Sequence, residues 1–301
     1  MAMLGNLHQR VGDEEARPAG DGAGGNRTAW GRVISTDVDI RQQGTVTPSS
    51  KGRVSGFQVG TDLWAPADWR TGIYVGQLEG DASVTGFARG VLGNNVGTND
   101  LRSQYLGLYG TYTPAATGFY ADAVLQAGRH RYAAHPTFNV PASGSGRSLL
   151  ASIEVGQSFA LAQNWSIEPQ LQLAHQSLNL DDALIPGALV QQNSHNGWIA
   201  RAGVRVKGMF ATSAGTLQPY ARFNVYHAGA GTDIARFIAP GGFTDVASRT
   251  GSTSTELAGG FTLGFRPGWS LYGELGRLFA SGGDARVQSS IQGSIGIKAR
   301  W

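Results

Sequence analysis

Cysteine is absent from this 301-residue chain, and charged residues are scarce, at 15%. Without cysteine the fold cannot depend on disulfides or on thiolate metal ligands. The sequence contains no run of roughly 18 consecutive apolar residues, which excludes a helical membrane protein. The formal net charge is only +3 and the arginines are scattered rather than clustered in a basic run, which argues against nucleic acid as a partner.

Glycine, in contrast, is abundant: its 45 residues are about twice the usual share. Aromatic and β-branched residues recur along the whole chain, which excludes a disordered protein. The length would suit two average domains, but barrels of this size are commonly a single domain. The composition therefore favours an all-β protein, either water-soluble or embedded in a membrane.

The first 27 residues differ from the rest of the chain. Leu4, Leu7 and Val11 recur at helical spacing, and a glycine-rich stretch then runs to Gly25. We therefore expect residues 1–27 to form a short helix and a linker, and residues 28–301 to form the main domain.

From Thr28 onward, apolar and polar residues alternate with the period of a β-strand. In the last segment, for example, Ile295 and Ile297 share one face while Lys298 and Arg300 share the other. The pattern predicts about twelve strands, near residues 28–38, 53–64, 71–80, 101–113, 118–128, 147–159, 165–175, 197–208, 216–227, 254–265, 269–279 and 290–301. Pro169 and Pro219 fall within two of them, and each predicts a local bulge because proline cannot donate to the strand ladder.

Most of these segments are longer than the five or six residues usual in soluble proteins, and they suit tilted strands that cross a bilayer. The connections alternate in length as well. They are short after the even-numbered segments and long after the odd-numbered ones, as at residues 81–100, 129–146, 176–196 and 228–253. This sorting is typical of outer-membrane barrels, in which short turns face the periplasm. The sequence thus predicts a 12-stranded antiparallel transmembrane β-barrel.

Tryptophan placement supports the same interpretation, because indole rings prefer the headgroup level of a bilayer. Only Trp198 maps to the long-loop edge. The predicted periplasmic aromatic girdle consists of Trp30, Trp64, Trp69, Trp165, Trp269 and Trp301.

Charged residues alternate with these apolar positions and should therefore face the lumen. A twelve-stranded barrel should have an intermediate bore, wide enough for one helix or extended segment. The predicted lumen-lining residues are Asp62, Asp122, Glu154, Glu168, Arg201, Arg205, Arg222, Glu256 and Glu274. They could line a water-filled pore or pair across it.

Several short motifs occur in the order and spacing of a known family. They are Asn6–Asp13, Trp30–Arg32, Gly56–Gly60, Gly107–Tyr112, Ile167–Leu171, Pro219–Ala221, Glu256–Gly260 and the closing segment Gly293–Trp301. By these motifs nearly the whole chain resembles the C-terminal translocator domain of classical monomeric autotransporters, the pertactin-like group in particular.

The resemblance implies a barrel in the outer membrane of a Gram-negative bacterium that carries an N-terminal passenger to the cell surface by type V secretion. It implies a monomer whose partners are outer-membrane lipid, the barrel-assembly machinery and its own passenger. Residues 4–15 would be the remnant of a helix that threads the pore. The terminal strand would be the assembly signal, with Ile295, Ile297, Ala299 and Trp301 on its outward face. One departure is that no Asn-Asn pair precedes the barrel.

Two other functions remain open at this point. A barrel alone also suits a small-solute porin, which a plugging N-terminal helix would argue against. An outer-membrane lipase or protease would need a nucleophile activated by histidine, and His175 lies two residues before Ser177, but no GxSxG elbow is present. The histidines are isolated and no phosphate loop occurs. We expect no catalytic residue, no metal and no cofactor.

Overall fold

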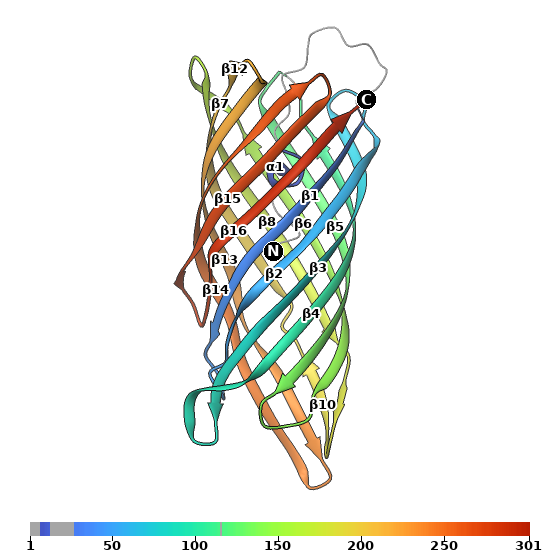
Figure 1. Ribbon diagram of the computed structural model, residues 1–301, viewed down its shortest axis with the longest axis vertical. Helices are drawn as coiled ribbons and strands as arrows, with labels where there is room; N and C mark the ends of the chain where they lie inside the picture. The colour runs from blue at the N-terminus through green and yellow to red at the C-terminus, as the bar shows by residue number, and fades with distance from the viewer. Residues whose placement is uncertain (1–6, 13–26, 115) are drawn as a thin grey trace.

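A closed antiparallel β-barrel dominates the computed structural model, which describes residues 7–12, 27–114 and 116–301 (Figure 1). Its elements are α1 (Leu7–Val11), β1 (Thr28–Gln42), β2 (Ser49–Trp64), β3 (Trp69–Ala88), β4 (Val91–Tyr112), β5 (Phe119–Pro136), β6 (Ala142–Gln157), β7 (Phe159–Ala162), β8 (Trp165–Leu180), β9 (Ala183–Ile185), β10 (Ala188–Asn193), β11 (Gly197–Gly208), β12 (Phe210–Thr212), β13 (Gly215–Ala239), β14 (Gly242–Arg266), β15 (Trp269–Gly282) and β16 (Ala285–Arg300).

The wall consists of twelve strands, so the predicted fold is confirmed. They follow one another as β1, β2, β3, β4, β5, β6, β8, β11, β13, β14, β15 and β16. The barrel closes where β1 pairs with β16, with Thr28 opposite Arg300. Closure is the physical requirement in lipid, where an unpaired strand edge would leave backbone polar groups without partners. Within the described ranges, no helix is both long and apolar enough to cross a bilayer.

Two of the short strands, β7 and β12, continue β6 and β11 beyond an interruption that lies opposite a proline. The β6–β8 register reaches Gly156 opposite Gln170 and resumes with Phe159 opposite Ile167, so the gap faces Pro169. The β11–β13 register likewise ends beside Pro219 and resumes with Phe210 opposite Leu217. The predicted bulges are wrong, because the register is unchanged across both gaps. Each proline removes a ladder hydrogen bond without adding a residue.

The strands are longer than the sequence pattern predicts, because the connections at residues 81–100 and 228–253 are not irregular loops. They are hairpins that extend the wall beyond the membrane, so that β13 and β14 each reach 25 residues. At the tip of the β3–β4 hairpin, Arg89 and Gly90 have φ values of 54° and 79°. Two successive left-handed residues make the turn that suits the twist of a hairpin. The shorter pair β9 and β10 adds to the same end by pairing with β13.

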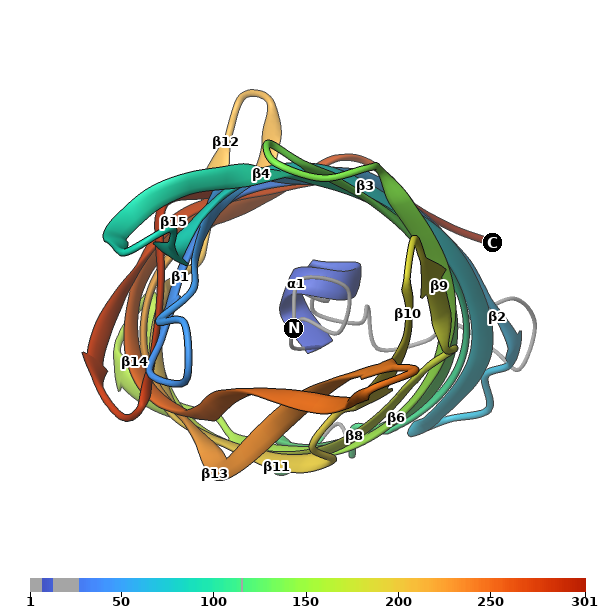
Figure 2. The ribbon, with the colours of Figure 1, turned by 90° about the horizontal axis from the view of Figure 1, so that it is seen from below.

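The helix α1 lies inside the barrel, as the end-on view shows (Figure 2). The wall residues that it contacts lie near the short-turn ends of their strands: Asp122 is three residues after the start of β5, and Tyr272 three after the start of β15. The helix therefore occupies the lumen close to the short-turn mouth. The structure describes only residues 7–12 of the expected pore helix, residues 4–15. Residues 13–26, which include the predicted linker, lie outside the described residues.

Candidate functional site

Strand alternation places the polar side chains in the lumen and the apolar ones outside. Along β8, for example, Glu168, Gln170 and Gln172 are buried, whereas Leu171 and Leu173 are about half exposed on the outer surface. The predicted lumen-lining residues follow this rule: Asp62, Asp122, Glu154, Glu168, Arg201, Arg205, Arg222 and Glu256 are each at most 4% exposed, and Glu274 is half-buried.

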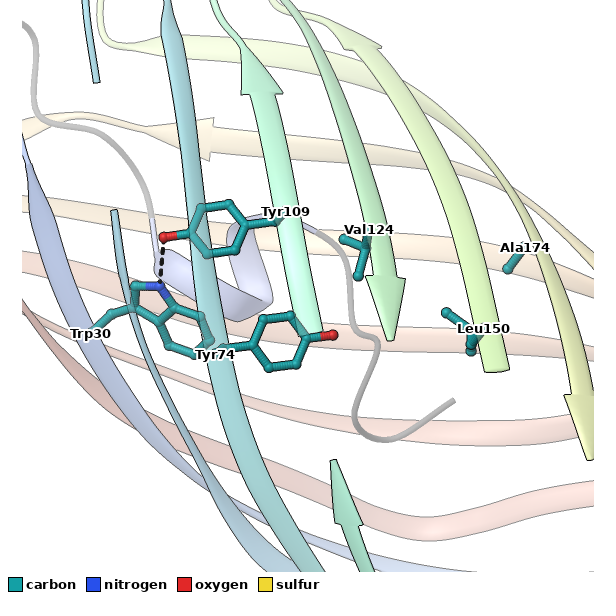
Figure 3. Close-up of a cluster of buried hydrophobic side chains, with 6 residues drawn as sticks. All are labelled: Trp30, Tyr74, Tyr109, Val124, Leu150 and Ala174. Atoms are coloured by element: carbon teal, nitrogen blue, oxygen red, sulfur yellow. Dashed lines mark hydrogen bonds between the residues drawn. The ribbon is translucent and has the colours of Figure 1, made fainter. Parts of the chain in front are cut away.

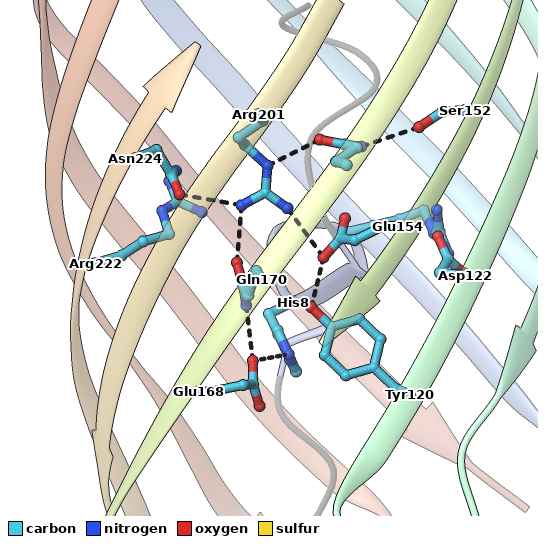
Figure 4. Close-up of polar contacts among 12 residues, drawn as sticks. His8, Tyr120, Asp122, Ser152, Glu154, Glu168, Gln170, Arg201, Arg222 and Asn224 are labelled. Atoms are coloured by element: carbon cyan, nitrogen blue, oxygen red, sulfur yellow. Dashed lines mark hydrogen bonds and ion pairs between the residues drawn. The ribbon is translucent and has the colours of Figure 1, made fainter. Parts of the chain in front are cut away.

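Arg201 of β11 is the centre of one buried network on the lumen wall (Figure 4). Its Nη2 lies 3.2 Å from Glu154 Oε1, its Nη1 donates to Gln170 at 2.8 Å, and its Nε donates to Gln172 at 2.9 Å. Glu154 also accepts a hydrogen bond from Tyr120 at 2.6 Å. The guanidinium thus connects β11 to β6 and β8 through charge-assisted bonds, and Glu154 extends the network to β5.

Arg222 of β13 forms a second centre. Its Nη2 lies 3.2 Å from Glu256 Oε2 and 2.8 Å from Glu274 Oε1, on the next two strands. Tyr220 donates to the other oxygen of Glu274 at 2.8 Å, and Tyr226 donates to Glu256 at 2.9 Å. A single cation thus pairs with two acids, and hydrogen bonds from the tyrosine hydroxyls offset part of the remaining negative charge, as buried charges require.

The helix α1 is bound to this wall by its side chains. Arg10 Nη2 lies 2.7 Å from Asp122 Oδ1, and its guanidinium lies 4.8 Å from the centre of the Tyr109 ring. His8 Nε2 lies 2.9 Å from Glu168 Oε1. Both side chains contact acids that the alternation of polar and apolar residues along the strands predicts to face the lumen. Because Arg10 is only 1% exposed, its charge depends on Asp122 for compensation.

The wall also satisfies the backbone at the C-terminal end of α1, where helix carbonyls lack intrahelical partners. Arg32 Nη1 donates to the carbonyl of Gln9, and the Tyr272 hydroxyl donates to that of Arg10, both at 2.8 Å. Gly12 follows with φ of 66°, the left-handed conformation that terminates many helices. The helix is therefore held by both side chains and backbone.

Aromatic rings form a second kind of contact inside the lumen. Trp30, Tyr74 and Tyr109 form a buried cluster with Val124, Leu150 and Ala174, in which the Trp30 indole N–H donates to Tyr109 at 3.4 Å (Figure 3). Several aromatic rings of the lumen, within this cluster and outside it, lie against a glycine of a neighbouring strand. A Cβ at Gly107 would lie 2.1 Å from the Tyr74 ring, and one at Gly156 would lie 2.3 Å from the Tyr120 ring. These glycines make room for aromatic side chains on the crowded inner surface.

Trp30 does not belong to the predicted outer girdle. It is 3% exposed, whereas Trp64, Trp69, Trp165, Trp269 and Trp301 are between 41% and 58% exposed. The sequence contains the signal for this difference, because Trp30 lies two residues before Arg32 and so shares its lumen face. Lumen residues that sequence reasoning missed, including Arg32, Tyr74, Tyr109, Tyr120 and Tyr272, lie on the same alternating face. The hydroxyl or guanidinium groups of four of them bond the helix or a buried acid, whereas the Tyr74 hydroxyl donates to Gln126.

Space remains in the lumen on the side of α1 that faces the long-loop end of the barrel. A cavity of about 460 Å³ is lined by Gln9 of the helix and by wall residues that include Ile34, Val287 and Glu256. The bore is therefore constricted by the helix rather than filled along its length.

The outward face of the terminal strand β16 is exposed at the predicted positions. Ile295, Ile297 and Trp301 are between 44% and 58% exposed, and Ala299 is partly exposed. Trp269 pairs with Ala299 in the neighbouring strand, at the short-turn rim. The strand thus presents its apolar side chains to the region where lipid would be.

The histidines have structural environments. His175 packs against Trp198 on the outer surface with ring centres 4.7 Å apart, and His130 lies between Ser103 at 2.8 Å and Ser148 at 2.7 Å. Among the described residues, no group of three or more histidines or acids is arranged to hold a metal ion.

A family model matches residues 29–276 of this chain, and its description is "Autotransporter beta-domain". Among curated proteins, the chain is 29% identical over 284 residues to the pertactin autotransporter of Bordetella bronchiseptica. That alignment covers 88% of this chain but 28% of the relative, so the chain spans little more than a quarter of its length. The adhesin BmaC autotransporter of Brucella suis is 26% identical over 345 residues, covering 99% of this chain and 9% of that protein.

Solved structures show the same fold. The β domain of the Bordetella autotransporter BrkA superposes with a TM-score of 0.68 at 19% identity, covering 92% of this chain and 100% of that chain. The transport unit of AIDA-I from Escherichia coli gives a TM-score of 0.71 at 17% identity, covering 95% of this chain and 93% of that chain. The NalP translocator domain from Neisseria meningitidis gives 0.66 at 14% identity, covering 93% of this chain and 90% of that chain.

Proposed function

This chain belongs to the autotransporter β-domain family, the outer-membrane barrels of Gram-negative bacteria that serve passenger secretion, and from that premise we propose how it acts. The lumen is the route by which a polypeptide attached upstream of Leu7 crosses the membrane. The barrel then remains in the membrane as the anchor of that passenger. The chain acts as a monomer and performs transport rather than bond-making chemistry.

The observation that carries this proposal is the position of α1, which is bound inside the lumen. A helix continuous with the N-terminal side of the chain lies inside the bore, and its Arg10 and His8 are bonded to Asp122 and Glu168 of the wall. A polar, charged lumen lowers the free-energy cost of moving backbone amides and carbonyls past lipid, because they keep hydrogen-bonding partners. The predicted lumen residues would have this role during transit and would seat the helix afterwards.

The test is to fuse an epitope-tagged reporter polypeptide upstream of Met1, behind a signal peptide, and express it in a Gram-negative host. We expect protease added to intact cells to remove the tag while a periplasmic marker stays protected. Barrel assembly is followed separately, by the gel shift of folded barrels between unheated and boiled samples. A reporter that remained protected in cells with fully assembled barrel would contradict the proposal.

A second experiment separates secretion from the porin alternative. In planar bilayers, the full chain should have a small conductance, because α1 constricts the bore. The chain without residues 1–27 should have a larger one. Equal conductances would show that the helix does not obstruct the pore and would favour a porin.

A further inference from the structure

Three arginines on the outer surface of β5 and β6 form a basic cluster that the lumen does not explain. Arg129, Arg131 and Arg147 all project outward and are exposed. Among the described residues, none of the three has an ion-pair partner. Asp181, which follows β8 beside them, accepts a hydrogen bond from Ser145 instead.

The strand register sets these charges against one another. Arg129 lies directly opposite Arg147 across the β5–β6 pair. Arg131 lies opposite Arg102 across β4–β5, and Arg102 is itself paired with Glu79 at 2.8 Å. Like charges directly opposite one another in a sheet are destabilising, and an anion between two cations would offset their repulsion. The facing pair Arg129 and Arg147 therefore has the charge pattern of an anion site, whereas Arg131 lines a depression that also holds Glu79 and Asp100.

A lipid-facing groove lies on the same strands, on the short-turn side of this cluster. It has a volume of about 440 Å³. Its floor is made by small residues, Gly110, Ala123 and Ala151, and larger exposed side chains such as Leu125 and Ile153 rise beside it. The small residues leave a depression wide enough for part of an acyl chain.

The two features lie on the same two strands, with the arginines on the long-loop side of the groove. Arg129 is four residues beyond Leu125 on β5, and Arg147 is four residues before Ala151 on β6. At a rise of about 3.3 Å per residue, each arginine is roughly 13 Å along its strand from the nearest residue that lines the groove. The paired rings of His175 and Trp198 lie at the same end of the groove. Indole rings favour the headgroup region, so the arginines are at or just above it.

We propose that this face binds one anionic lipid of the outer leaflet that carries more than one phosphate. The phosphates lie between Arg129, Arg131 and Arg147, and one acyl chain lies in the groove over Ala123 and Ala151. The planar guanidinium binds phosphate oxygens in pairs, which a zwitterionic headgroup with a single phosphate cannot use equally well. The bound lipid removes the repulsion between Arg129 and Arg147.

The test is native mass spectrometry of the detergent-solubilised full chain with three lipids: bis-phosphorylated lipid A, its monophosphorylated form and phosphatidylcholine. We expect one tightly bound bis-phosphorylated molecule, weaker binding of the monophosphorylated form and the weakest binding of phosphatidylcholine. The double variant Arg129→Gln/Arg147→Gln should weaken lipid A binding about 30-fold. Inorganic phosphate alone should bind far more weakly than lipid A.

The matched control is Arg277→Gln/Lys51→Gln, which removes the same charge from two other exposed sites on the barrel. It should leave the affinity for lipid A unchanged. For the groove, Ala151→Trp should weaken binding, while Ala202→Trp, at an exposed position on β11, should not. All variants are first checked for assembly by the gel shift.

Equal loss of affinity in the two charge variants would overturn the proposal, as would equal affinity for lipid A and phosphatidylcholine. Binding of inorganic phosphate as tight as that of lipid A would also overturn it, because the acyl chain would then contribute nothing. Unchanged binding in Ala151→Trp would overturn the groove as the seat of the chain.

Discussion

Arg10 illustrates how single residues of α1 depend on the barrel wall. Its guanidinium is 1% exposed, and Asp122 is the acid that compensates it at 2.7 Å. Asp122 also accepts a hydrogen bond from Thr111 at 2.6 Å, so its position is fixed independently of the helix. Removing one member of a buried pair leaves an uncompensated charge, which costs far more than the intact pair contributes.

We therefore predict that Asp122→Asn loosens the helix in its seat. A cost of about 3 kcal/mol corresponds to a roughly hundredfold higher population of the unseated helix. Tryptic cleavage after Arg10 in the folded, detergent-solubilised protein should accelerate by about that factor. The control is Glu79→Gln, which breaks the exposed pair with Arg102 and should leave the cleavage rate unchanged. Equal cleavage rates in Asp122→Asn and the unaltered chain would show that the pair does not hold the helix.

Sequence alternation identifies which residues face the lumen but not which of them meet. Asp122 and Glu168 are placed correctly on the inner face by period two alone. Arg222 and Glu274, however, are on strands separated by β14, and their 2.8 Å contact depends on strand tilt and register around the closed barrel. Local sequence carries no information on that geometry. For the same reason, the contacts of Arg10 and His8 with the barrel wall could not be predicted from the sequence.

At the scale of elements, glycines on the inner face allow neighbouring strands to carry large aromatic side chains. Gly156 of β6 lies under the Tyr120 ring of β5, whose hydroxyl donates to Glu154. A methyl group at this position would occupy the space of the ring itself, since the Cβ would lie 2.3 Å from Tyr120 Cε1. The packing between β5 and β6, here called the β5–β6 seam, thus depends on the absence of a side chain at Gly156.

We predict that Gly156→Ala destabilises the barrel by about 1–3 kcal/mol, the usual range for overpacking. The ring must tilt away and lose part of its bond to Glu154. The measurement is the temperature at which the folded gel band converts to the unfolded one. Gly241→Ala, at a hairpin tip where no atom lies within 4 Å of the added Cβ, is the control. A conversion temperature equal to that of the control would contradict this account of the seam.

The terminal strand permits a prediction that separates cellular assembly from folding. Trp301 is exposed at the rim and makes its backbone bonds with Arg27, so its indole side chain is free for recognition. Trp301→Ala should reduce the assembled fraction in cells several-fold if this strand is the assembly signal. Spontaneous folding into lipid vesicles should hardly change. Trp269→Ala, at the same rim, is the control. A similar loss in both variants would indicate a general girdle effect rather than a signal.

Strand existence was predictable from the sequence, whereas strand ends were not. Alternation is clear where one face meets lipid and the other water, as from Trp165 to His175 on β8. Ten residue steps at a tilt of about 40° rise roughly 25 Å, the height of the apolar band. Beyond the membrane both faces of a hairpin meet water, so the apolar period disappears although the strand continues. The outer parts of β13 and β14 are of this kind.

The whole molecule is a closed wall in which the register of the membrane part is distinct from that of the outer hairpins. In the β13–β14 pair, the register is unbroken from Thr216 opposite Gly264 to Ala228 opposite Ser252, and it shifts before Gly231. That continuous part is longer than the roughly 9–11 residues that a tilted strand needs to cross a bilayer. The shift separates that part from the outer β13–β14 hairpin, whose tip lies at the lower end of Figure 1.

We predict that replacing residues 229–251 with a two-residue Asn-Gly turn leaves the barrel assembled, with a conversion temperature within a few degrees of the intact chain. The membrane-spanning ladder and the buried Arg222 cluster are untouched by this change. The control deletes two facing pairs inside the span, Val225–Tyr226 and Ser254–Thr255, which preserves alternation but shortens the wall and removes the Tyr226 bond to Glu256. This control should assemble poorly in the gel-shift assay. If the hairpin truncation impaired assembly as severely as the shortened wall, the outer hairpin would be part of the structural unit rather than an extension of it.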